Sequence, residues 1–125
     1  MENRVRNEME IDLAGQKVLL RPTFENIASL ESSHGSLAWL GWKFSRGLQD
    51  GKNMPGLTDY AHIIYHCQAA TKAEDPTKKL YSLEEIWDLV QQSGVSLLQP
   101  MMIFIARITA GNKMVNELND NQKKS

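Results

Sequence analysis

The stretch Val18-Leu19-Leu20-Arg21-Pro22-Thr23-Phe24-Glu25 decides the fold, because the chain changes there from the periodicity of a strand to that of a helix. Proline disfavours α geometry in the residue before it, so the strand ends at Arg21. Thr23 is placed to cap the helix, since its hydroxyl can accept a hydrogen bond from a free N–H of the first turn. We therefore expect a helix over 24–34 whose core face begins at Phe24, with Gly35 as its C-terminal cap.

A second strand is expected upstream of this step. Met9, Ile11 and Leu13 alternate with acidic residues, which is the pattern of a half-buried strand. The turn residues Ala14-Gly15-Gln16 then lead into 18–20, so the two strands predict a hairpin. A two-stranded hairpin is marginal alone, and we expect it to pack on the helices that follow.

The rest of the chain shows helical patterns over 36–48, 58–71, 82–93 and 96–111. Ser36 and Thr58 are the expected N-caps, and Ser82 with Glu85 predicts a capping box. Tyr60, Ile63, Ile64 and Cys67 have the spacing of a core stripe. The sequence thus predicts a mainly α fold, with an N-terminal β-hairpin packed on a bundle of about five helices. The expected organisation is a flexible segment 1–7, one domain over 8–111 and a disordered tail over 112–125.

Composition places the chain among ordinary globular proteins. It has 125 residues, of which 42% are hydrophobic and 23% are charged, and a net charge of −1. This balance gives no overall electrostatic bias toward nucleic acid or acidic lipid. The single cysteine, Cys67, excludes an internal disulfide and fits a reducing compartment. The N-terminus lacks a signal-peptide pattern and the apolar run 101–106 is too short to span a bilayer, so we expect a cytoplasmic protein without a membrane partner.

Asp59, His62 and His66 share one flank of the 58–71 helix, because spacings of three and four residues bring side chains together. One reading is a transition-metal site. The other is a set of solvated residues beside the core stripe, which the absence of an HExxH motif or a second cysteine cluster favours. We expect no metal here.

Further candidates for chemistry have simpler readings. Cys67 could be a nucleophile with His66 or His34, but free cysteines are usually buried small hydrophobes. The acidic residues at 84, 85 and 88 suit the first turns of a helix through its macrodipole. The glycines at 47, 51 and 56 are spaced too loosely for a phosphate loop. We therefore expect no catalytic residue, no cofactor and no enzymatic activity.

The 36–48 helix is apolar on two sides. Its first face carries Leu37, Leu40, Phe44 and Leu48, and the opposite face carries Trp39, Trp42, Lys43 and Arg46. Because large aromatic residues are mostly buried, we expect the tryptophans to pack under the hairpin or the 47–57 loop. The alternative is a protein-binding face, since tryptophan and arginine are typical of binding hot spots. These four residues are the candidate binding site.

The hairpin and the step into LRPTFENIASLESSHG resemble the start of phage tail assembly chaperones of the gene-transfer-agent type. Members begin with a β-turn-β segment, a Leu-Arg-(Pro or Leu)-Thr-Phe step and a helix of small and apolar residues closing on Glu. The residues that match are Leu20, Arg21, Thr23, Phe24, Ala28, Leu30 and Glu31. A weaker similarity continues through 60–65 and 82–85 to the last apolar helix.

The resemblance implies a small helical protein of a phage or prophage that binds the tail tape-measure protein, and also tail-tube subunits, during tail morphogenesis. It implies a non-enzymatic chaperone that is absent from the mature virion. Self-association is left open. The alternative class is a small helical adaptor or regulatory protein of phage origin that binds a host protein. A tape-measure gene immediately downstream would separate the two.

Overall fold

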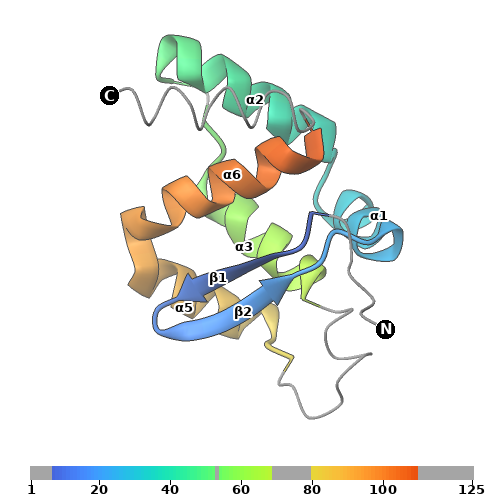
Figure 1. Cartoon of the computed structure of the whole chain (residues 1–125), viewed down its shortest axis with the longest axis vertical. Coiled ribbons are helices and arrows are strands. Elements are labelled where there is room, and N and C mark those ends of the chain that lie inside the picture. Colours follow the sequence, from blue (N-terminus) through green and yellow to red (C-terminus); the bar gives the residue numbers. More distant parts are fainter. Residues whose placement is uncertain (1–6, 53, 69–79, 110–125) are drawn as a thin grey trace.

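The computed structural model describes residues 7–52, 54–68 and 80–109, and it is mainly helical with an N-terminal hairpin (Figure 1). The elements are β1 (Met9–Leu13), β2 (Gln16–Leu20), α1 (Phe24–Ser33), α2 (Leu37–Asp50), α3 (Leu57–Cys67), α5 (Leu83–Ser93), a 3₁₀ turn η1 (Gly94–Leu97) and α6 (Leu98–Thr109). Because α5, η1 and α6 follow one another without a loop, the described part of the chain has four helical segments after the hairpin, slightly fewer than the five expected. The fold class is confirmed. Residues 1–6 of the expected flexible segment 1–7, and the whole of the expected 112–125 tail, lie outside the described residues.

The hairpin has the predicted alternation. Strands β1 and β2 are antiparallel, and Leu13 pairs with Gln16 across a two-residue turn. Ala14 and Gly15 both have positive φ, at 53° and 88°, which is the geometry that matches the twist of paired strands. Asp12 supports the turn, because its Oδ1 accepts a hydrogen bond from the Gly15 N–H at 2.7 Å. The apolar side chains at 11, 13, 18 and 20 are buried against the helices.

The strand-to-helix step has the expected cap but a different buried face. Thr23 Oγ1 accepts from the Asn26 N–H at 3.1 Å, and α1 begins at Phe24. The buried residues of α1 are Asn26 and Leu30, whereas Phe24 is 84% exposed. The expectation that Phe24 begins the core face is therefore wrong. At 100° per residue, Phe24 lies about 160° from Asn26 around the helix, so it points to the opposite side.

Asn26 completes a polar junction, formed by Arg21, Asn26 and the Cys67 carbonyl, that joins β2, α1 and α3. The Arg21 N–H donates to the Cys67 carbonyl at 2.9 Å. The Asn26 Nδ2 donates to the Arg21 carbonyl at 2.8 Å and to the Cys67 carbonyl at 3.3 Å. Both side chains are buried, and the Arg21 Nε forms an ion pair with Glu8 at 3.2 Å. The backbone N–H and carbonyl of Arg21, directly after β2, thus both have hydrogen-bond partners inside the fold, as buried backbone groups require.

Two helix ends differ from the sequence expectation. Helix α2 continues past 48 to Asp50, because Gly51 with φ of 70° supplies the left-handed C-cap while Gly47 stays inside the helix. Helix α3 begins after Gly56, so Thr58 is not its cap. Asp59 selects this start, since its Oδ2 accepts from the Gly56 N–H at 2.8 Å. The expected end of that helix, at 71, lies outside the described residues.

The C-terminal half is as regular as predicted. Ser82 and Glu85 form the reciprocal capping box at the start of α5, with both bonds at 3.1 Å. The buried Gln68 side chain bonds the backbone N–H and carbonyl of Tyr81, which joins the end of α3 to the start of α5. By length and composition, the continuous segment Leu83–Thr109 would suffice to cross a membrane. Several of its apolar residues also belong to the hydrophobic core, and 33% of its most apolar window is buried.

One hydrophobic cluster connects all the elements. The hairpin contacts α3 and α5, α1 packs on α3, and α2 packs on α6 (Figure 1). The predicted stripe of α3 is fully inside this cluster, as are Leu37 and Leu40 of α2. The side of α2 turned away from the core is where the candidate residues lie.

Candidate protein-binding site

The tryptophan pair of α2 lies on the molecular surface. Trp39 is 56% exposed and Trp42 is 51% exposed, so the expectation that they pack under the hairpin or the 47–57 loop is wrong. The rings stack on one another, with centroids 4.8 Å apart and planes 12° from parallel. They are three residues apart on one helix, which is the spacing that places side chains side by side. The opposite face of α2 is the one that packs inside the protein, and its Leu37, Leu40 and Phe44 are buried.

Two basic side chains flank the pair, and each has an acidic partner. Arg46 Nε lies 3.6 Å from Asp50 Oδ2, one turn further along α2. Lys43 Nζ lies 3.9 Å from Asp59 Oδ2 of α3, and its side chain is 30% exposed. The four candidate residues therefore share one side of α2, but Lys43 sits at the edge nearest α3.

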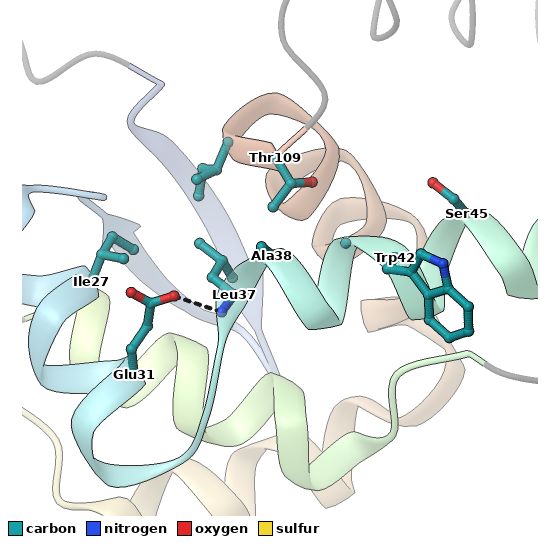
Figure 2. A pocket seen from close by; sticks show the side chains of 9 residues that line it. Ile27, Glu31, Leu37, Ala38, Trp42, Ser45 and Thr109 are labelled. Carbon is teal, nitrogen blue, oxygen red and sulfur yellow. Dashed lines mark hydrogen bonds between the residues drawn. The ribbon is translucent and has the colours of Figure 1, made fainter.

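A groove beside the pair extends the surface (Figure 2). It has a volume of about 550 Å³ and lies between α1, α2 and α6. Ile27 and Glu31 of α1 stand at one end, Trp42 and Ser45 of α2 at the other, and Thr109 of α6 borders it (Figure 2). Glu31 is held in place because its Oε2 accepts a hydrogen bond from the Leu37 N–H at 2.8 Å.

Gly41 explains how α2 and α6 come close enough to form this groove. A Cβ on Gly41 would lie 2.5 Å from Thr109 Oγ1 and 2.7 Å from Thr109 Cβ, well inside van der Waals contact. The absence of a side chain at this position thus lets the end of α6 rest on α2. Sequence reasoning did not single out Gly41, since an isolated glycine within a helix carries no signal of its packing partner.

Covering the exposed tryptophan rings with a partner would give a substantial gain in free energy. A tryptophan side chain buries up to about 250 Å², so covering the exposed halves of two rings removes about 250 Å² from water. At about 25 cal/mol per Å², this is a gross gain of about 6 kcal/mol before the costs of association. Exposed tryptophans beside a groove with an apolar floor form the kind of patch that marks interaction sites. The arrangement suits an amphipathic helix laid against α2.

Asp59, His62 and His66 are close together as the sequence predicts, and the fold adds His34 from the end of α1. His34 Nε2 donates to Asp59 Oδ1 at 2.8 Å, while the Gly56 N–H occupies Asp59 Oδ2. Both carboxylate oxygens of Asp59 are thus engaged in hydrogen bonds within the protein, one to the end of α1 and one to the start of α3. Among residues 7–52, 54–68 and 80–109, no group of three or more such side chains is arranged to hold a metal ion. His34 was missed because only the packing of α1 on α3 brings it here.

The other chemical candidates have structural roles. Cys67 is buried, and burial raises the pKa of its thiol to about 12, so the thiol is protonated at neutral pH. Glu85 belongs to the capping box, and Asp88 accepts a hydrogen bond from Gln92 at 3.1 Å. Gly51 and Gly56 cap helices and Gly47 lies inside one, so the three do not form a phosphate loop.

Comparisons with protein-family models, with curated proteins and with solved structures found no match for this chain. The resemblance to tail assembly chaperones therefore stays a prediction from the sequence.

Proposed function

We propose that this chain is a tail assembly chaperone of a phage or prophage that binds helices of the tape-measure protein through α2. The single observation that carries the binding role is the stacked, half-exposed pair Trp39 and Trp42 beside the α1–α2–α6 groove. The partner class comes from the sequence resemblance. On this proposal the chain acts in the bacterial cytoplasm, also engages tail-tube subunits, is absent from the finished tail and needs no catalytic residue.

The groove suits a helical partner whose apolar side chains repeat at the spacing of one helix face. A tape-measure helix would place apolar side chains at i, i+3 and i+4 against the tryptophans and the floor of the groove. Arg46 at the border of the patch is paired with Asp50 but stays 56% exposed, so it also suits acidic side chains on that helix, because rim charges favour correct encounter. A chaperone has to release its client, and a patch of this size is consistent with reversible binding.

The test is co-purification of the chain with the tape-measure protein encoded next to it. The double variant Trp39→Ala with Trp42→Ala should lose the complex, because the apolar patch is removed, while its far-UV CD spectrum stays unchanged. Phe24→Ala is the matched control: it also removes a highly exposed aromatic ring, but from α1. We expect this control to keep full binding.

Two outcomes would count against the proposal, and a third would call for a second variant. A tape-measure complex that survives loss of both tryptophans would exclude the α2 face as the binding site. No complex with the wild-type chain would remove the chaperone role. Unfolding of the double variant would show that the rings stabilise the fold. In that case Trp42→Arg, which keeps a long side chain at a half-exposed position, tests the face again.

A further inference from the structure

All three histidines of the chain form one row, the histidine stack His34–His62–His66. The rings of His34 and His62 are stacked with centroids 4.1 Å apart and planes 14° from parallel. His66, one turn further along α3, lies 6.4 Å from His62 with planes 16° from parallel. Since His34 follows α1 and the others belong to α3, the stack joins two helices.

Hydrogen bonds fix the ends of the stack and leave its middle without a partner. His34 Nε2 donates to Asp59 Oδ1, and His66 Nδ1 lies 2.9 Å from the Ser29 hydroxyl of α1. In the middle, His62 Nδ1 is shielded from solvent and has no hydrogen-bond partner within the described part of the chain. A neutral ring can leave Nδ1 as an unpaired acceptor, but a protonated ring would bury an N–H donor with nothing to accept it.

The charged groups around the stack do not compensate for three protonated rings. Asp59 of α3 accepts the hydrogen bond from His34, and Lys43 of α2 adds a positive charge 3.9 Å from that same carboxylate. From α5, Glu84 borders the hollow of about 290 Å³ that His62 also lines. Arg21, which directly follows β2, is paired with Glu8. Within residues 7–52, 54–68 and 80–109, one carboxylate thus bonds the stack directly, and a lysine lies beside that carboxylate.

We propose that the histidine stack is a pH-sensitive contact that holds α1 on α3 while His62 and His66 are neutral and releases α1 in mild acid. A proton on His62 would place a charge beside the His34 ring, with centroids 4.1 Å apart, and would leave its shielded Nδ1–H without an acceptor among the described residues. The release would also change the groove, because Ile27 and Glu31 of α1 form one of its ends (Figure 2). This inference does not depend on the identity of the partner.

The titration of the rings has the direction that such a contact requires. Burial lowers the pKa of His62, and the neighbouring His34 lowers it further, against an opposing effect of Asp59. Burial, then His62 and His34, lower the pKa of His66. The folded state therefore binds fewer protons than the unfolded state as pH falls below about 6.5, the ordinary value for histidine. The stabilising effect is complete above that pH and is lost progressively as pH falls toward the folded-state values.

The test measures urea unfolding of the full chain between pH 7.5 and 5.5. For each proton taken up on unfolding, the folded-to-unfolded ratio should fall up to about tenfold per pH unit, and His62 with His66 provide two such sites. The variant His62→Gln with His66→Gln should lose most of this dependence, since glutamine does not titrate. An unchanged pH profile in this variant would overturn the proposal.

Two further measurements keep the test decisive if that variant does not fold. NMR of the wild-type rings should give midpoints for His62 and His66 below 6.5, and His34→Gln should move the His62 midpoint upward. Hydrogen exchange, corrected for intrinsic rates, should lose protection on acidification at the His34 and Leu37 amides before the Glu85 amide of α5. Ordinary midpoints for both rings, or equal loss in α1 and α5, would refute release of α1.

Discussion

Replacement of Asn26 by alanine tests whether the polar junction joins the hairpin to the helices. The variant removes two hydrogen bonds that the Asn26 amide donates, at 2.8 Å to the Arg21 carbonyl and at 3.3 Å to the Cys67 carbonyl. Cys67 keeps the bond from the Arg21 N–H, but the Arg21 carbonyl loses its asparagine donor in a buried position. Each lost bond costs about 1 kcal/mol, and a buried group that loses its partner costs about 1–3 kcal/mol. We expect the free energy of unfolding to fall by about 3 kcal/mol, a large part of the total for a domain of this size.

Urea unfolding followed by far-UV CD at pH 7.5 measures this loss. With a typical slope of about 1–3 kcal/mol per molar urea, the midpoint should move down by about 1–3 M. Ser32→Ala is the matched control, because Ser32 is exposed on the same helix, and its effect should stay within about 0.5 kcal/mol. Asn26→Asp keeps the shape but replaces the donor with a buried charge, so it should cost at least as much as the alanine variant. A loss below 0.5 kcal/mol for Asn26→Ala would refute the reasoning.

Two further predictions follow from close packing and from burial. Gly41→Ala should destabilise the protein by about 1–3 kcal/mol and weaken partner binding, because the new methyl group would press on Thr109 within the groove. Thermal unfolding and co-purification measure the two effects. Unchanged stability would show that α6 moves away freely. In the native protein, Cys67 should react with a thiol reagent at pH 8 at least about a hundredfold more slowly than in the urea-unfolded protein, since its buried thiol has a pKa raised to about 12. Equal rates in the two states would mean that α3 opens readily.

The parts of the fold that depend on neighbouring residues could be predicted from the sequence. Thr23, Ser36 and Ser82 cap their helices as expected, because a cap depends on residues two or three positions away. The start of α3 was misplaced because Gly56 and Thr58 are both acceptable caps locally. Only the bond from Gly56 to Asp59 decides between them.

The candidate site was harder to predict because it depends on contacts between distant elements. Helix α2 has two apolar faces, and its sequence does not say which one the core takes. Nor does periodicity reveal that His34 stacks on His62, or that Gly41 meets Thr109, since each pair comes from different helices. Phe24 shows the opposite error, because an aromatic residue at the first helical position has a core-like pattern but no surface to pack on.

Two residues of the sequence resemblance, Arg21 and Thr23, belong with Asn26 to the hydrogen-bonded step between β2 and α1, whereas the tryptophans belong to the proposed binding surface. Arg21, Thr23 and Asn26 are engaged in bonds that hold β2, α1 and α3 together, so their chemistry is used within the fold. The tryptophans of α2 are turned away from this junction and contribute half of their surface to solvent. A change at Asn26 should therefore lower binding only by the fraction of molecules that unfold, whereas a change at Trp39 or Trp42 should lower binding at constant stability. Because the two effects differ in their dependence on urea, one titration of the complex with denaturant would distinguish a folding motif from a binding surface.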